Sequence, residues 1–249
     1  PYTLSTMATT RLETMARAVQ GRLWFQLYVL RDQAMTSQLV ERARAADYEA
    51  LVVTVDLPAG GKRERDLRNG ISIPLRIGPR LIRDAMIRPG WVWRMARHPQ
   101  PAFENVRGLL GDDSAGLTIA ARVGQNLDAR YDWGDLARLR DQWPRKLLVK
   151  GVEHPADAKR LAALGVDGIW ISNHGGRQLD GAIASFDAVP AIRAAVGDDL
   201  PLLLDSGVRR GIDVLKAVGR GVEAVGIGRA ALYGAAVAGE AGVERVLDI

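Results

Sequence analysis

One short segment of the sequence gathers the residue types needed for base catalysis on an anion. It runs Ser172-Asn173-His174-Gly175-Gly176-Arg177-Gln178-Leu179-Asp180 and follows the apolar run Gly168–Ile171. Histidine titrates near neutral pH, so His174 is a candidate general base. The two glycines permit a sharp turn and a close approach of the backbone. Arg177 lies close enough along the chain to grip a carboxylate beside that base through two hydrogen bonds.

Seven short apolar runs predict β-strands, and longer amphipathic stretches lie between them. The expected strands are Tyr2–Ser5, Leu23–Val29, Ala50–Asp56, Lys146–Gly151, Gly168–His174, Leu202–Gly207 and Ala224–Gly228. Runs that are apolar almost throughout, such as Leu51–Val55, suit parallel strands covered on both faces. Helices are expected at Gln38–Ala46, Ala156–Leu164 and Ile212–Val218, with Gly165 and Gly219 ending the last two. The alternation indicates right-handed βα units.

Polar residues gather at the carboxyl ends of these strands. They are Ser5, Gln26, Tyr28, Thr54, Asp56, Lys150, Ser172, His174, Asp205 and Arg229. In a (β/α)8 barrel those ends surround one mouth, which forms the active site. We therefore predict an α/β fold of the TIM-barrel type and prefer it to an open doubly wound sheet. Since the chain opens on a strand and stops without a helix stop signal, we expect the first strand and last helix of the barrel to lie outside it.

Length and composition fit one barrel domain over residues 1–249. The chain is 47% hydrophobic and 25% charged, as in globular proteins. It contains no cysteine, which excludes disulfides, a thiolate nucleophile and Cys-ligated metal sites, and we expect no metal ion. The net charge of +5 makes nucleic acid or an anionic membrane a partner to consider. No recognised nucleic-acid-binding module accompanies that charge, so we expect no nucleic-acid partner.

The segment 73–110 is expected to leave the barrel between two strands. Within it, Ile73–Pro101 carries Trp91 and Trp93 among arginines, together with spaced apolar residues. Its cations include Arg76, Arg80, Arg83, Arg88, Arg94 and Arg97. This composition is typical of a segment lying on an anionic bilayer. The alternative interpretation is a lid over the barrel mouth.

Two loops near the end of the chain could hold a phosphate group. They are Asp205-Ser206-Gly207-Val208-Arg209 and Gly226-Ile227-Gly228-Arg229. Each offers glycine N–H groups and an arginine, and they follow the last two predicted strands. Barrels often bind phosphate at this position, beside a helix N-terminus.

Taken together, these motifs resemble the FMN-dependent α-hydroxy-acid oxidases and dehydrogenases. Besides 172–180, the likeness includes Trp24-Phe25-Gln26-Leu27-Tyr28, Thr54-Val55-Asp56 and Leu148-Val149-Lys150-Gly151, in the family's order. The mandelate dehydrogenases are the most similar members, through Arg140-Asp141-Gln142-Trp143-Pro144 and the basic segment. The resemblance implies an FMN-dependent enzyme that oxidises a 2-hydroxy acid to a 2-oxo acid.

The resemblance also assigns roles to individual residues. His174 would be the base and Asp56 the carboxylate that orients it, while Tyr28, Arg63 and Arg177 would bind the substrate. FMN would be held by Ser5, Gln26, Thr54, Lys150, Ser172, Asp205, Gly207, Arg209, Gly228 and Arg229. Of these, Lys150 would stabilise negative charge on the reduced flavin, and Arg209, Gly228 and Arg229 would hold its phosphate. His98 and His154 lie outside the pattern of strand ends and receive no role.

By the same resemblance, the substrate is (S)-mandelate, the product benzoylformate and the electron acceptor a membrane quinone. The enzyme would attach to the cytoplasmic face of the inner membrane through 73–101 and form a homotetramer. The alternatives are an L-lactate dehydrogenase, an oxygen-using oxidase of the same family and an inactive fragment. Met7 replaces a tryptophan of some oxidases, which favours a dehydrogenase. A phosphate-binding barrel isomerase is the non-redox competitor, but it would not need Lys150 together with the His174–Arg177 pair.

Overall fold

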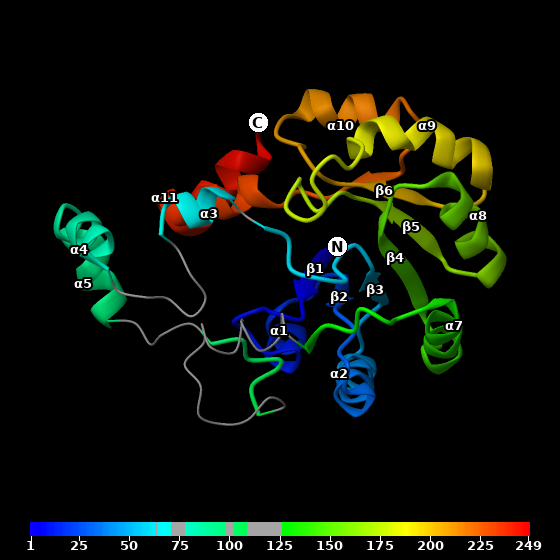
Figure 1. The fold of residues 1–249 in the computed structure, drawn as a ribbon, viewed down its shortest axis with the longest axis horizontal. Coiled ribbons are helices and arrows are strands. Elements are labelled where there is room, and N and C mark those ends of the chain that lie inside the picture. Colours follow the sequence, from blue (N-terminus) through cyan, green and yellow to red (C-terminus); the bar gives the residue numbers. More distant parts are fainter. Residues whose placement is uncertain (63, 71–77, 98–101, 109–125) are drawn as a thin grey trace. The chain divides into compact units, whose positions relative to one another are not determined.

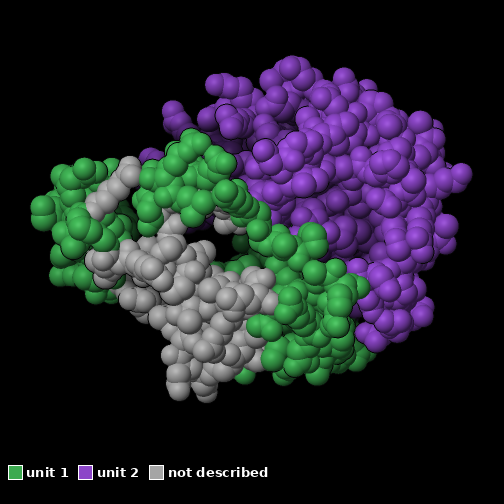
Figure 2. Space-filling model, in the orientation of Figure 1, with its two compact units in different colours: residues 1–49, 58–130 green, residues 50–57, 131–249 purple. Residues whose placement is uncertain are grey.

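The computed structural model describes residues 1–62, 64–70, 78–97, 102–108 and 126–249. The chain divides into two compact units (Figure 2). Unit 1 comprises Pro1–Glu49 and Pro58–Arg130, and unit 2 comprises Ala50–Leu57 and Tyr131–Ile249. Strands and helices alternate through much of both units, as the sequence pattern predicts (Figure 1).

Unit 1 contains a pair of parallel strands with helices beside them. Its described elements are β1 (Tyr2–Ser5), α1 (Leu12–Ala18), β2 (Leu23–Leu27), α2 (Gln33–Ala45), α3 (Glu64–Arg68), α4 (Pro79–Met86) and α5 (Pro89–Arg97). Leu4 of β1 lies opposite Phe25 of β2, and both side chains are fully buried. Helix α2 begins at Asp32, whose carboxylate accepts hydrogen bonds from the N–H groups of Ala34 and Met35.

Unit 2 contains five parallel strands that pair in chain order. Its elements are β3 (Ala50–Thr54), α7 (Trp133–Gln142), β4 (Lys146–Val152), α8 (Pro155–Leu164), β5 (Gly168–Ile171), α9 (Ser185–Val196), β6 (Leu202–Leu204), α10 (Gly211–Val218), β7 (Ala224–Val225) and α11 (Arg229–Leu247). Strand β4 pairs with both β3 and β5, and β6 pairs with both β5 and β7. Helix α8 packs on α9, and the two cover the strands from one side (Figure 1).

All seven predicted strands are confirmed, but most end before their predicted carboxyl ends. Strand β5 stops at Ile171 where the sequence predicted His174, and β3 stops at Thr54 where it predicted Asp56. His174 has a φ of 57°, which no strand accommodates. Asp56, Ser172, His174 and Asp205 therefore stand in loops, where their side chains are not committed to the faces of the sheet. Ser5, Gln26, Thr54 and Lys150 lie within strands.

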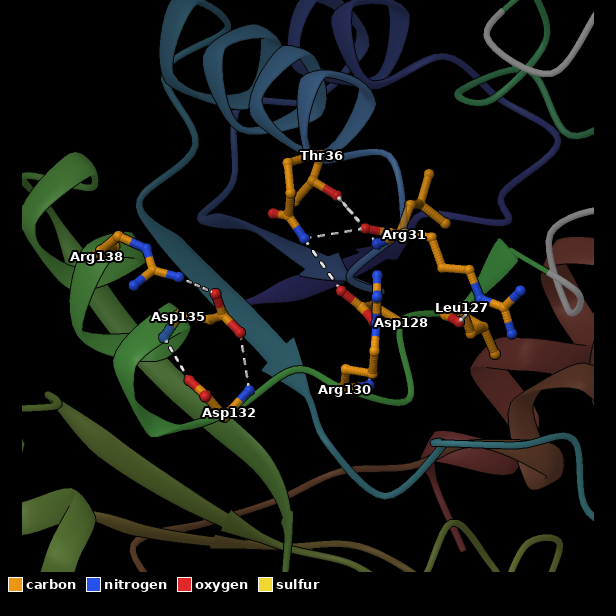
Figure 3. Close-up of polar contacts among 10 residues, drawn as sticks. Arg31, Thr36, Leu127, Asp128, Arg130, Asp132, Asp135 and Arg138 are labelled. Atoms are coloured by element: carbon orange, nitrogen blue, oxygen red, sulfur yellow. Dashed lines mark hydrogen bonds and ion pairs between the residues drawn. The ribbon is translucent and has the colours of Figure 1, made fainter.

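A reciprocal pair of carboxylates fixes the start of α7 (Figure 3). The side chain of Asp132 accepts hydrogen bonds from the N–H groups of Gly134 and Asp135, at 2.8 and 3.0 Å. The carboxylate of Asp135 accepts from the N–H of Asp132 at 3.0 Å and also pairs with Arg138. These backbone hydrogen bonds lower the pKa of Asp132. This stabilisation is therefore present above the ordinary carboxyl pKa and is lost as the pH falls through the lowered one.

The basic segment is only partly described, because 73–77 and 98–101 lie outside the described residues. Within the rest, α4 and α5 contact each other. Ile82, Met86, Trp91 and Trp93 are each at least half exposed, and the Arg97 guanidinium lies 3.9 Å from the centre of the Trp93 ring. No helix in the described ranges is both long and apolar enough to span a membrane.

The two predicted helix-ending glycines both end their helices but differ in conformation, and we expect different effects when alanine replaces them. Gly165 is left-handed at φ 80°, with no atom within 4 Å of an added Cβ, so Gly165→Ala should lower the free energy of unfolding by about 1–2 kcal/mol. Gly219 is right-handed at φ −62°, and an added Cβ would lie 3.3 Å from the carbonyl oxygen of Leu215. Because it avoids the strain of a left-handed backbone, Gly219→Ala should cost less stability than Gly165→Ala. Urea titration of both variants tests this, and equal losses of stability would contradict it.

Candidate active site

The loops after β3 and β5 bring a carboxylate and an imidazole together. Nδ1 of His174 lies 3.0 Å from Oδ1 of Asp56, although the two residues are 118 positions apart. Their side chains are 15% and 11% exposed. A carboxylate at Nδ1 orients the ring and favours the tautomer that leaves Nε2 free to accept a proton. The pair therefore has the geometry of a general base and its orienting carboxylate.

Gly151 makes room for this carboxylate. The residue has a φ of 98°, and a Cβ added there would lie 2.6 Å from the Cβ of Asp56 and 2.9 Å from its backbone nitrogen. Only glycine combines that backbone conformation with so close an approach. Gly151 belongs to the motif Leu148-Val149-Lys150-Gly151, but the sequence indicated no function for it. Its contact with Asp56 depends on the register between β3 and β4, which cannot be derived from the sequence.

Lys150 occupies the same end of unit 2. Its Nζ donates to Oγ of Ser172 at 2.6 Å and pairs with Oδ2 of Asp205 at 2.9 Å. The Lys150 and Asp205 side chains are 13% and 18% exposed, and Ser172 is fully buried. Ser172 Oγ also accepts from the N–H of His174 at 3.0 Å. One serine thus connects the lysine with the histidine loop, so four predicted site residues share one cluster of hydrogen bonds and ion pairs.

A second link was not predicted from the sequence. Oγ of Ser206 donates to Oδ1 of Asp205 and accepts from the N–H of Gly175, both at 2.9 Å. Ser206 has a φ of 78°, a conformation that non-glycine residues adopt only with strain. The carbonyl of Gly175 in turn accepts from Arg229 at 2.7 Å. His174, Lys150 and Arg229 therefore belong to one connected network.

The loops predicted to bind phosphate offer fewer backbone donors than their glycines suggested. The N–H groups of Arg209 and Arg210 already donate to the Asp213 carboxylate at 3.0 and 3.1 Å. The N–H of Gly226 donates to the carbonyl of Leu204. An anion here would depend mainly on the exposed arginines Arg209 and Arg229, and on the start of α11 at Gly228.

The remaining predicted residues include Arg177, Thr54, Gly207 and Arg63. Arg177 is exposed, three residues beyond His174, and Thr54 is buried at the end of β3. Gly207 has a φ of 94°. Arg63 lies outside the described residues.

In unit 1, Ser5, Gln26 and Tyr28 are brought together. Oγ of Ser5 donates to the Gln26 side chain at 3.0 Å. The buried hydroxyl of Thr6, which the sequence reasoning missed, donates to the carbonyl of Gln26 at 2.6 Å and accepts from the N–H of Tyr28 at 3.1 Å. Thr6 belongs to none of the motifs identified in the sequence, so nothing there indicated that role. These contacts fix the loop after β1 against the end of β2.

Comparison with known proteins identifies the family. The family model described as FMN-dependent dehydrogenase matches residues 1–249. The chain therefore belongs to the FMN-dependent dehydrogenases, whose cofactor is FMN. It is 42% identical over its whole length to the L-lactate dehydrogenase of Caulobacter sp. (strain K31), and 41% identical to that of Pseudomonas aeruginosa (strain LESB58). It spans 66% and 65% of those two proteins.

Solved structures of the family confirm the fold class. A structure described as the monotopic membrane protein (S)-mandelate dehydrogenase matches the whole chain with a TM-score of 0.91 and 43% identity, and the chain covers 65% of it. A soluble mutant of the membrane-associated (S)-mandelate dehydrogenase from Pseudomonas putida matches with a TM-score of 0.79 and 40% identity, with 63% covered. The parallel strands and alternating helices are those of the FMN-dependent barrel enzymes, of which this chain spans about two thirds.

The described residues fit FMN. A flavin phosphate requires cations and N–H donors, which Arg209, Arg229 and the start of α11 can supply. A reduced flavin carries negative charge, and Lys150 is a largely buried cation in the same network. Asp205 offers a carboxylate for hydroxyl groups beside that lysine. In the described ranges no cluster of three or more histidine and acidic residues could hold a metal ion.

The close approach at Gly151 predicts a clash that another left-handed glycine would not cause. Gly151→Ala should lower the free energy of unfolding by about 1–3 kcal/mol more than Gly181→Ala, because overpacking adds to backbone strain. Gly181 has a φ of 78° and no atom within 4 Å of an added Cβ, so it serves as the matched control. Urea titration of both variants measures the difference. Equal losses would show that Asp56 is not held against Gly151.

Proposed function

We propose that the protein is an FMN-dependent 2-hydroxy-acid dehydrogenase that converts (S)-mandelate to benzoylformate and passes the electrons to a membrane quinone. The 3.0 Å contact between His174 Nδ1 and Asp56 Oδ1 is the single observation that carries this proposal. The similarity to (S)-mandelate and L-lactate dehydrogenases supports it. L-Lactate is the alternative substrate, because the L-lactate dehydrogenases match the chain about equally well.

In the proposed reaction, His174 removes a proton from the substrate through Nε2. Asp56 lies against the ring and stabilises the imidazolium that forms. FMN, when bound, would accept the two electrons and the second hydrogen that the substrate loses. Lys150 contributes a positive charge in the same network, where negative charge develops.

The substrate is an anion, and Arg177 and Arg63 are the proposed contacts to its carboxylate. Arg177 is exposed in the loop that carries His174, so it can reach an anion held beside the imidazole. Tyr28 is a proposed hydrogen-bond donor to the substrate. Ser5, Gln26, Thr54, Ser172 and Gly207 are proposed FMN contacts, which the family likeness supports.

Replacing His174 tests the base directly. His174→Ala should retain FMN, because the histidine holds no cofactor phosphate, but its flavin absorbance should not be bleached by (S)-mandelate or L-lactate without oxygen. We expect a loss of rate of at least about a hundredfold, as for other general bases. His154→Ala is the matched control, since His154 only caps α8. Normal bleaching of the His174→Ala variant would reject the base assignment.

Electron acceptors then separate a dehydrogenase from an oxidase. A mandelate oxidase mutant is also similar to this chain, with 33% identity and a TM-score of 0.76. The reduced wild-type protein should reoxidise rapidly with a quinone analogue and slowly with oxygen. Rapid reoxidation by oxygen would favour the oxidase.

We also propose that 73–101 attaches the protein to an anionic membrane surface, on the cytoplasmic face of the inner membrane. Helices α4 and α5 support this, because exposed apolar side chains and cations lie on the same two helices. Each cation near such a surface contributes about 1 kcal/mol, which salt weakens. The single-domain organisation over 1–249 and the homotetramer also stay predictions.

The two tryptophans should dominate that attachment. Trp91→Ser combined with Trp93→Ser should weaken binding to phosphatidylglycerol vesicles more than about tenfold, because burying one large apolar side chain contributes about 1.5–3 kcal/mol. Leu215→Ser is the control, since Leu215 is 68% exposed but lies on α10, outside the segment. Cosedimentation at low and high salt measures the effect. Unchanged binding by the double variant would reject the proposed surface.

A further inference from the structure

Two carboxyl oxygens near the His174–Asp56 pair are buried without a hydrogen-bond partner among the described residues. They are Oδ2 of Asp56 and Oε1 of Glu153. The other oxygen of Asp56, Oδ1, contacts Nδ1 of His174. A buried polar atom without a partner costs about 1–3 kcal/mol, and more when it is charged. Each of these oxygens is therefore expected to have a hydrogen-bond partner.

The fold places the two carboxyl groups at the same end of neighbouring strands. Val55 donates its N–H to the carbonyl of Lys150, and Asp56 then packs against the backbone of Gly151. Glu153 follows directly after β4, two residues beyond Gly151. Burial raises the pKa of Glu153, and the nearby charge of Asp56 raises it further. The glutamate is thus held where its protonated form is favoured.

We propose that Glu153 is a positioning residue for the His174–Asp56 pair, and that its protonated carboxyl group donates a hydrogen bond to Oδ2 of Asp56. One shared proton would satisfy both unpartnered oxygens. It would also leave Asp56 charged and hold its Oδ1 toward the imidazole. The role rests on the proposed function, because it concerns the orientation of the proposed base.

The charges around Glu153 determine whether its ionisation makes folding more or less favourable as the pH rises. The charge of Asp56 helps to raise the pKa of Glu153. His174 contacts Oδ1, the other oxygen of the Asp56 carboxylate. The adjacent His154 is exposed and directs Nδ1 to the N–H of Ala156, at the start of α8. Since the pKa of Glu153 is higher in the folded protein, folding becomes less favourable as the pH rises from the ordinary carboxyl value through the raised one.

Melting temperature against pH tests the protonated carboxyl without reference to activity. Glu153→Gln keeps a donor for Asp56 but cannot ionise. In the FMN-loaded full-length protein, the melting temperature of Glu153→Gln should match that of the wild type in acid. It should then exceed it increasingly as the pH rises. A constant difference across the pH range would overturn the proposal, because it would show that Glu153 does not ionise from a raised pKa.

The rate of anaerobic flavin reduction by (S)-mandelate or L-lactate tests the positioning role. Glu153→Leu removes the donor and should slow reduction about tenfold, whereas Glu153→Gln should stay within about threefold of the wild type. Glu240→Leu, at an exposed position on α11, is the control for loss of a carboxyl group. Wild-type rates in both Glu153 variants would overturn the proposal.

The two measurements separate this inference from the proposed function. If neither acid reduces the wild-type protein, the proposed function fails, and the melting curves still decide whether Glu153 shares its proton. If the wild type is reduced but Glu153→Leu is not slowed, the function stands and the positioning role fails.

Discussion

The contact between His174 and Asp56 is the constraint on which the rest of the site depends. A largely buried imidazole beside a largely buried carboxylate is stable only if both residues are held in place by their surroundings. Three features of unit 2 meet that requirement: the left-handed backbone of His174, the hydrogen bond from its N–H to Ser172, and the space left by Gly151 for Asp56. The register between neighbouring strands aligns their ends, and this places the loops that carry Asp56 and His174 beside each other.

Two cations of the network, Lys150 and Arg229, already have partners within the protein. Lys150 contacts Asp205, and Arg229 contacts the carbonyl of Gly175, so the largely buried cation and the exposed one each have a partner before any ligand binds. Such pairing keeps the desolvation of charge tolerable and fixes where each side chain points. An anion that binds Lys150 or Arg229 would therefore exchange contacts that these side chains already make within the protein. This favours a preorganised site, in which binding requires little rearrangement.

Much of this could be predicted from the sequence, because local signals were strong. The apolar run Leu51–Val55 gave β3, and the left-handed cap at Gly165 followed from a glycine at the end of a helical pattern. The gathering of His174, Lys150 and Asp205 followed from their positions at or near the predicted carboxyl ends of strands. The helix Gly211–Val218 also ends at the predicted Gly219, although the φ of that residue is helical and does not require glycine.

What could not be predicted depends on contacts between distant parts of the chain. The use of the Arg209 N–H by Asp213, the bridge through Ser206 and the packing of Gly151 on Asp56 all follow from register and loop geometry. Glu153 had no motif to mark it, and only burial beside Asp56 distinguishes it from a surface glutamate. Residue type alone does not carry that information.

A crystal structure of the FMN-loaded full-length protein with an unreactive 2-hydroxy-acid analogue tests the central claim most directly. The account predicts that Nε2 of His174 and the guanidinium of Arg177 face the same bound carboxylate anion. It also predicts the flavin ring beside Lys150 and its phosphate beside Arg229. A flavin or an anion bound away from these four residues, or His174 turned from Asp56 in the complex, would contradict it.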